Sequence, residues 1–190
     1  MKIQSLVQGR RMRGFTMIEL IVVIVILGIL AAVALPRFTG IQRDARIAKL
    51  NAARGAVQAA AAMVHGTALA RSGQGNIPAV GACGVTNATA AGGGTICTEA
   101  GVINIVNWYP QATAASIISA AGLVSTFPAT NAALNVEQYN TTGGGGGVGA
   151  TLTIQVQGGV NAPTCSFTYR PSSGVAGSAA VISPVNTAGC

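Results

Sequence analysis

Glu19 is the clearest candidate for a functional residue, because it is a carboxylate inside an apolar segment. Residues 15–35 contain no polar side chain other than those of Thr16 and Glu19, and a helix of this length can span a bilayer. A charge at the middle of a membrane costs about 2.5–3.5 kcal/mol on insertion scales. A residue that costs this much is expected to serve a function, so the sequence predicts a partner for this carboxylate.

A positive charge in the same low-dielectric zone is the simplest partner for Glu19. Cleavage of the chain between Gly14 and Phe15 would create one, the new α-amino group of Phe15. Four residues of helix rise about 6 Å, so the amine and the carboxylate can meet within one chain or across two staggered chains. Pairing between chains would make Glu19 a register device for polymerisation, as a single buried polar residue is in a coiled coil.

An ordinary secretory signal is a competing interpretation of the same segment. A basic leader precedes the apolar run, and Ala32-Val33-Ala34 would serve as a small-residue cleavage site. Cleavage after Ala34 would release a secreted domain, for which carbohydrate binding is the alternative function. A disposable signal has no use for Glu19, and this favours a segment that is retained.

The segment also resembles a known motif. It reads Arg13-Gly14-Phe15-Thr16-Met17-Ile18-Glu19-Leu20, followed by the apolar run and Pro36. This closely resembles the type IV prepilin signature, which type II secretion pseudopilins share. The resemblance implies that a membrane aspartyl peptidase cuts after Gly14 and methylates the amine of Phe15, and that Glu19 meets this amine on a neighbouring subunit. Thr16 and Pro36 are expected to act in assembly together with Glu19.

Later residues extend the resemblance more loosely. They are Pro36-Arg37-Phe38, Gln42-Arg43-Asp44-Ala45-Arg46, Trp108-Tyr109-Pro110 and the loop from Cys165 to Cys190. This pattern is most similar to pilins of the mannose-sensitive haemagglutinin group. A type II secretion pseudopilin is the alternative, although the calcium-site acids of the major pseudopilin are not found in this sequence.

The resemblance implies a structural subunit of a type IV pilus and a set of partners. The precursor is expected to cross the inner membrane once, with its leader in the cytoplasm, and to meet a prepilin peptidase and an inner-membrane assembly platform. Identical or related pilin subunits then join it in an extracellular fibre for adhesion or motility. The sequence does not identify the host or surface receptor.

An enzyme, a cofactor and a metal site are not expected. His65 is the only histidine and has no nucleophile pattern around it, and the four cysteines lack the spacing of a zinc site. The chain has 11 Lys and Arg against 4 Asp and Glu, but after Arg54 only two basic and two acidic residues remain. A neutral surface of this kind offers little to nucleic acid, which is therefore not an expected partner.

The cysteines predict an oxidising compartment. Cys83, Cys97, Cys165 and Cys190 allow three pairings, of which the local one, Cys83 with Cys97 and Cys165 with Cys190, closes two short loops. A loop of this size is worth roughly 3 kcal/mol in the chain-entropy model. Free structural thiols are the alternative. The pairing implies a space outside the cytoplasm.

A long helix must position these residues. Residues 39–71 lack proline and are rich in Ala, Arg, Gln and Leu, so we expect the helix to continue past Pro36, which would kink it. On a helical wheel two apolar stripes appear, which predict two packing partners. The first is Ile47, Leu50, Val57, Ala61, Val64 and Ala68, and the second is Ile41, Ala45, Ala48, Ala52, Ala56, Ala59 and Met63. A helix buried on both sides within one domain is the alternative.

The remaining sequence predicts a smaller α+β head. Residues 152–156 and 165–169 alternate at period two and are expected as strands, with weaker candidates at 134–140 and 179–185. A short helix is predicted over 110–122, an irregular loop over 72–100 and a flexible hairpin connection over 143–147. The expected fold is the α+β pilin fold, a long amino-terminal helix packed on an antiparallel sheet of about four strands.

Four segments follow from this interpretation. Residues 1–14 are the expected prepilin leader peptide, 15–36 the transmembrane and polymerisation helix, 37–71 the amphipathic half of the helix, and 72–190 the globular pilin head with its disulfide-pinned loops.

Overall fold

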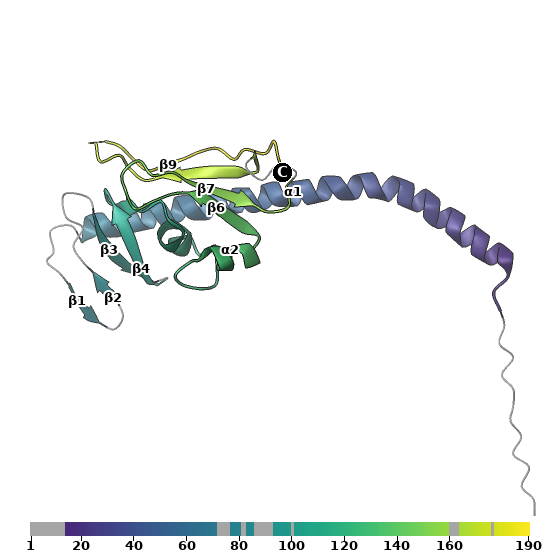
Figure 1. The fold of residues 1–190 in the computed structure, drawn as a ribbon, viewed down its shortest axis with the longest axis horizontal. Helices are drawn as coiled ribbons and strands as arrows, with labels where there is room; N and C mark the ends of the chain where they lie inside the picture. The colour runs from purple at the N-terminus through teal and green to yellow at the C-terminus, as the bar shows by residue number, and fades with distance from the viewer. Residues whose placement is uncertain are drawn as a thin grey trace, which may run out of the picture. The chain divides into compact units, whose positions relative to one another are not determined.

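Helix α1 (Met17–Ala70) dominates the computed structural model (Figure 1). The structure describes residues 14–71, 77–80, 83–85, 93–99, 101–159, 164–175 and 177–190, with only the backbone given at 39, 77–80 and 83–85. Pro36 lies inside α1, which confirms that the helix continues past it. The residue four positions earlier is Ala32, whose small side chain suits the crowding that a proline ring causes in a helix.

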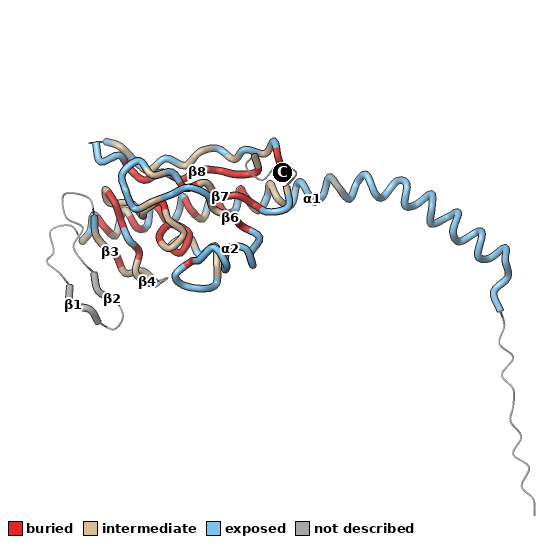
Figure 2. Tube along the Cα trace, viewed as in Figure 1, coloured by how far each residue is buried: buried red, intermediate tan, exposed pale blue. Residues whose placement is uncertain are grey.

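The chain divides into two compact units, and the division falls within α1. The first unit ends at Ile41, and the second runs from Gln42 to Cys190. Every described side chain from Phe15 to Phe38 is exposed, which Figure 2 shows as an unbroken pale-blue stretch. Because these side chains are almost all apolar, this part of α1 has no core of its own within the chain.

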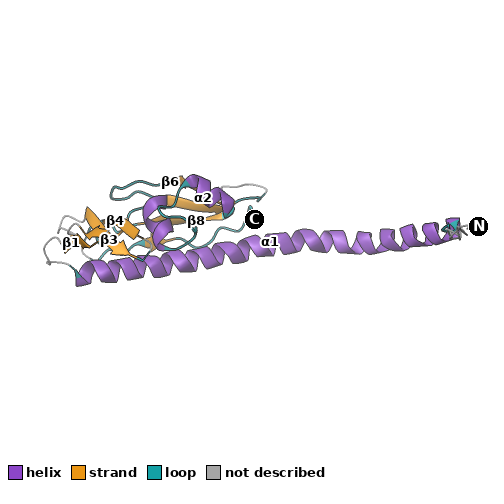
Figure 3. Ribbon diagram, turned by 90° about the horizontal axis from the view of Figure 1, so that it is seen from below, coloured by secondary structure: helices purple, strands orange, loops and turns teal. Residues whose placement is uncertain are grey.

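The second unit contains the α+β fold that the sequence predicts. Four antiparallel strands form one sheet in the order β6 (Tyr139–Gly143), β7 (Leu152–Val156), β8 (Ser166–Arg170) and β9 (Val181–Ile182). A second antiparallel sheet has the order β3 (Gly93–Thr98), β4 (Gly101–Val106) and β5 (Tyr109–Pro110). Strands β1 (Ile77–Val80) and β2 (Cys83–Val85) form a separate pair. The strands lie along the part of α1 that is farther from its amino-terminal end (Figure 3).

The main core lies between α1 and the four-stranded sheet. Leu50 and Val57 of α1 are fully buried, together with Ile154 of β7 and Tyr169 of β8. A smaller cluster joins the end of α1 to the three-stranded sheet and consists of Val64, Ala68, Ile96 and Ile105. Burying such side chains is worth about 1.5–3 kcal/mol each for the larger ones, so α1 is an integral part of the head.

The segment around residue 134, a weak strand candidate, is instead helical in its first half. Helix α2 (Asn131–Val136) begins where the Thr130 hydroxyl accepts a hydrogen bond of 3.2 Å from the backbone N–H of Ala133. This N-cap satisfies one of the amides that a helix start leaves without a partner, and the prediction missed it. The strand β6 begins only at Tyr139.

Two further expectations need correction. Residues 72–100 contain β1, β2 and β3, although Gly- and Thr-rich composition predicted an irregular loop. The helix predicted over 110–122 begins only at Ala114, because Pro110 belongs to β5, and it is a π-helix over Ala114–Ile118. It has ended by Gly122, which has a φ of +62° that suits glycine.

The glycine run after β6 connects β6 to β7, as predicted, but its backbone is held in place. The N–H of Gly144 donates to the carbonyl of Thr151 at 2.8 Å, and the N–H of Gly145 donates to that of Ala112 at 2.9 Å. Gly144 has a φ of +90°, and a Cβ there would lie 2.4 Å from the Ala112 oxygen. Glycine is therefore required by close approach at this position.

Candidate functional site

The start of α1 is closed by reciprocal hydrogen bonds between Thr16 and Glu19. The Glu19 carboxylate oxygen Oε2 accepts from the backbone N–H of Thr16 at 3.0 Å and from its hydroxyl at 2.8 Å. In return, the backbone N–H of Glu19 donates to the Thr16 hydroxyl oxygen at 3.3 Å. This is a capping box, in which two amides of the first helical turn find side-chain acceptors.

The capping box gives Glu19 an intrachain partner that the sequence analysis did not consider. Its signal is the spacing Thr-x-x-Glu immediately before an apolar run, which Thr16 and Glu19 provide. The carboxylate is thus held against the helix start. It lies close in sequence to Phe15, the residue expected to carry the new amine.

Gly14 and Phe15 lie outside the helix, which begins at Met17. The Phe15 side chain is 88% exposed, and within the described part of the chain nothing beyond the adjacent residues lies within 4 Å of the position that a Cβ would take on Gly14. Exposed backbone next to a helix end is the kind of chain that proteases reach most easily. The geometry is therefore compatible with cleavage between these two residues, which stays a prediction.

The two apolar stripes of α1 differ sharply in burial. In the first, Leu50, Val57 and Ala68 are fully buried, whereas in the second Ile41 and Met63 are each 63% exposed. The other alanines of the second stripe are exposed too, except Ala56, which is half-buried. The first stripe packs on the head, whereas the second is mostly exposed in the described part of the chain. This contradicts the alternative of a helix buried on both sides.

Three basic residues of α1 bind the head through backbone carbonyls. Arg46 Nη1 donates to the carbonyl of Cys190 at 2.9 Å, and Arg54 Nε donates to that of Ser183 at 2.8 Å. Lys49 Nζ donates to the carbonyl of Glu137 and lies 4.5 Å from the centroid of the Tyr139 ring. These cations therefore fasten three separate segments of the head to one helix.

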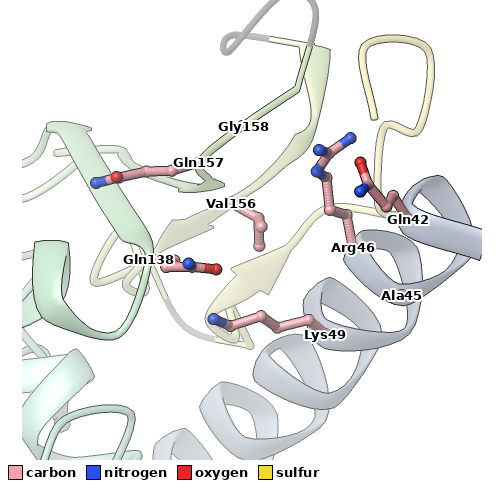
Figure 4. A pocket seen from close by; sticks show the side chains of 8 residues that line it. All are labelled: Gln42, Ala45, Arg46, Lys49, Gln138, Val156, Gln157 and Gly158. Carbon is pink, nitrogen blue, oxygen red and sulfur yellow. The ribbon is translucent and has the colours of Figure 1, made fainter. Parts of the chain in front are cut away.

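A cleft opens beside two of these cations, and we call it the neck cleft (Figure 4). Its volume is about 460 Å³. It is lined by Gln42, Ala45, Arg46, Lys49, Gln138, Val156, Gln157 and Gly158. Among these described lining residues, only Arg46 and Lys49 carry a charged side chain. The sequence predicts that these two residues lie on the helix. It does not predict that residues 138 and 156–158 of the head lie beside them.

The structure has a disulfide between Cys165 and Cys190, whose Cα atoms are 4.8 Å apart. Because Cys165 is buried beside β8 and Arg46 holds the Cys190 carbonyl, the bond ties the last residues to both the sheet and α1. Cys97 is also disulfide-bonded. The side chain of Cys83, its expected partner, lies outside the described residues.

His65, Trp108 and Tyr109 meet at the distal part of α1. The His65 and Tyr109 rings are stacked with centroids 4.1 Å apart, and His65 Nδ1 lies 3.2 Å from the Trp108 carbonyl oxygen. Trp108 packs against the smaller core cluster. These contacts are those of packing residues. Among the described residues, no three His, Cys, Asp or Glu side chains are grouped closely enough to hold a metal ion.

Comparisons with known proteins match the amino-terminal part of the chain. A family described as the prokaryotic N-terminal methylation motif matches residues 9–35. The type IV narrow pilus major component PilA5 of Thermus thermophilus is 49% identical over 53 residues, which cover 28% of this chain and 46% of the relative. No solved structure matches the chain.

The match to this relative covers less than half of either protein. The matched motif includes the start of α1, a helix that is long and apolar enough to cross a membrane. The segment that carries Gly14, Phe15 and the Thr16–Glu19 capping box therefore matches the N-terminal methylation motif, and the chain is similar in part to a type IV pilus major component.

Proposed function

We propose that this chain is a structural, non-enzymatic subunit of a type IV pilus, made as a membrane-anchored precursor. One observation carries the proposal. A segment that matches the methylation motif forms an exposed apolar stretch of helix in a chain that is similar in part to a pilus major component, and the same helix continues into the core of a folded head. An apolar helix that packs on nothing in its own chain needs lipid or other subunits around it.

Processing would convert the precursor into an assembling subunit. The leader, residues 1–14, is removed by a prepilin peptidase after Gly14, and the new amine of Phe15 is methylated. The amine stays positively charged after methylation, so it can pair with the Glu19 carboxylate of a neighbouring subunit. Thr16 holds that carboxylate at the helix start until the amine arrives, which is supported by the capping box.

During polymerisation, other copies of the same helix would replace the lipid that surrounds the apolar part of α1. The segment 15–36 and the exposed stripe of the amphipathic half, 37–71, offer apolar surface that the head, 72–190, leaves uncovered. The alanines of this stripe let neighbouring helices approach closely. Pro36 would give the helix the local freedom to fit its neighbours.

The expected setting is the inner membrane, then an extracellular fibre. The partners are identical or related subunits, the peptidase and an inner-membrane assembly platform, and the fibre serves adhesion or motility. Within type IV pilins, we place the chain nearest to the mannose-sensitive haemagglutinin group. This finer assignment is supported by the motif Trp108-Tyr109-Pro110 and by the loop that Cys165 and Cys190 close. No observation favours a type II secretion pseudopilin.

The proposal is tested by the mature amino terminus and by the fibre. Mass spectrometry of fibres sheared from cells should find methylated Phe15 as the first residue. A Glu19→Ala precursor should be inserted and cleaved yet give few fibres, whereas Asp44→Ala, which removes an exposed carboxylate outside the apolar run, should assemble normally. A mature protein that begins at Leu35 would instead indicate a secreted domain and refute the pilus assignment.

A further inference from the structure

We propose that the neck cleft binds a phosphate group, supplied by an anionic phospholipid headgroup or by free phosphate. The lipid source rests on the membrane anchoring in the proposed function, whereas the binding chemistry does not. The cleft lies within the second unit, and its two charged lining side chains are cationic.

The two cations stand on the same side of α1. Arg46 and Lys49 are three residues apart, and this spacing makes them neighbours on a helix surface. A guanidinium has five N–H donors and an ammonium has three. The main-chain oxygen of Cys190 takes one donor of Arg46, and the carbonyl of Glu137 takes one of Lys49. These bonds hold both groups in position and account for one donor of each.

Gly158 keeps the space beside the guanidinium open. It has a φ of +84°, and a Cβ there would lie 3.4 Å from Arg46 Nη2 and 3.5 Å from Nε. A side chain at this position would therefore extend toward the guanidinium from the side of Nη2 and Nε. These two atoms form the fork that binds two oxygens of a phosphate side by side.

Gln138 adds a polar group under backbone strain. Its φ is +56°, in the left-handed region that glycine or asparagine occupies at little cost, and its side chain lines the cleft. Gln138 directly follows Glu137, the C-cap of α2, and a left-handed residue often ends a helix at this position. The amide of Gln138 faces the same opening as Arg46 and Lys49 (Figure 4). The amide nitrogen of Gln157, in contrast, donates hydrogen bonds to the side-chain oxygen of Asn135 and to the carbonyl of Tyr139.

The cleft suits phosphate better than a simple cation or an apolar ligand. Its lining includes the guanidinium of Arg46, the ammonium of Lys49 and the amide of Gln138, and none of its described lining residues is acidic. Only residues 36–41 separate the end of the apolar run from Gln42, the first residue of the cleft. In a subunit that is anchored by this run, only a few residues therefore separate the membrane-spanning segment from the cleft.

The test is a titration of the full chain as a monomer in maltoside micelles, which contain no phosphate. The backbone N–H of Gly158 reports binding by NMR while sodium phosphate or a short-chain phosphatidylglycerol is added, with sodium chloride at matched ionic strength as the reference. We expect a saturable shift. Lys49→Gln should weaken binding about tenfold, as loss of one charged hydrogen bond does, and the matched control Arg43→Gln less than about twofold.

Gln138→Gly is the second variant, because it removes the amide while relieving the strain and so leaves the fold intact. It should weaken phosphate binding by about threefold, the effect of a modest hydrogen bond. A response to both ligands assigns the lipid source, and a response to phosphate alone assigns the free anion. The proposal is overturned if neither ligand gives a saturable shift, or if Arg43→Gln weakens binding as much as Lys49→Gln. Because the protein stays monomeric, a failure of fibre assembly would not affect this result.

Discussion

Arg46 of α1 and Cys190 are 144 positions apart in sequence, and the guanidinium Nη1 of the first lies 2.9 Å from the carbonyl oxygen of the second. This bond closes the head onto the helix at the same end as the Cys165–Cys190 disulfide. Arg46→Gln should lower the free energy of unfolding of the head by about 1–2 kcal/mol, because a partly buried charged donor is lost. Thermal unfolding of the full chain in detergent measures the change.

The control for this prediction is Arg43→Gln, which removes the same charge from an exposed position on the same helix. It should change the melting temperature little, since exposed charges contribute at most about 1 kcal/mol. Equal melting temperatures for Arg46→Gln and Arg43→Gln would contradict the role of the bond.

The capping box predicts that the hydroxyl of Thr16 matters more than its size. Thr16→Val keeps the shape but cannot bind the Glu19 carboxylate, and it should weaken the helix start by about 1 kcal/mol. Thr16→Ser keeps the hydroxyl. We expect fewer fibres from Thr16→Val and near-normal yield from Thr16→Ser, counted by electron microscopy after both precursors are shown to be cleaved. Equal yields from the two would remove Thr16 from assembly.

Gly144 is predicted to be intolerant of any side chain. In Gly144→Ala the new Cβ would meet the Ala112 carbonyl oxygen at 2.4 Å on a backbone with positive φ. The substitution should destabilise the head by about 2 kcal/mol or more. Gly147→Ala is the matched control, because no atom lies within 4 Å of its Cβ position. Chemical denaturation of both variants tests the difference, and similar midpoints would contradict it.

The buried phenol of Tyr169 predicts a loss of stability in alkali. Burial, and to a lesser extent the charge of Tyr109, raises the pKa of Tyr169 above its usual value. Because the folded state holds the proton more tightly, the stabilisation is complete below about pH 10 and is lost as the pH rises further. Burial also raises the pKa of Tyr139, which adds to the same slope.

Tyr169→Phe separates these effects. The hydroxyl donates to the Pro110 carbonyl at 2.7 Å, so its removal should cost about 1 kcal/mol at neutral pH and flatten the decline above about pH 10. Free energies of unfolding at a series of pH values measure both changes. An unchanged alkaline slope would show that Tyr169 does not titrate with unfolding.

Removing the bond between Cys165 and Cys190 should destabilise the head by about 3 kcal/mol, because it closes a loop with a sequence separation of 25. The double variant Cys165→Ser, Cys190→Ser tests this, with the reduced wild-type protein as its control. Reduction also opens the bond at Cys97, so reduced wild type should be at least as unstable as the variant.

The long helix and strands β7 and β8 could be predicted from sequence because their periodicity is strong and continuous. The three-stranded sheet was missed, since short runs of Gly, Thr and Ile between residues 93 and 106 carry little periodic signal. The capping box was readable from the spacing of Thr16 and Glu19. The neck cleft could not be predicted. Gln138 precedes β6 and Gly158 follows β7, and only the fold brings these two distant positions to the same cleft as Arg46.

Lys49 and Arg54 recognise main-chain oxygens at positions 137 and 183, and every amino acid carries such an oxygen. The exposed side chain of Glu137 is therefore not needed for this attachment, whereas the hydroxyl of Ser183 also accepts a hydrogen bond of 2.9 Å from the backbone N–H of Thr168. Position 137 can therefore vary and change what the surface of the head presents, while the bond to Lys49 stays the same.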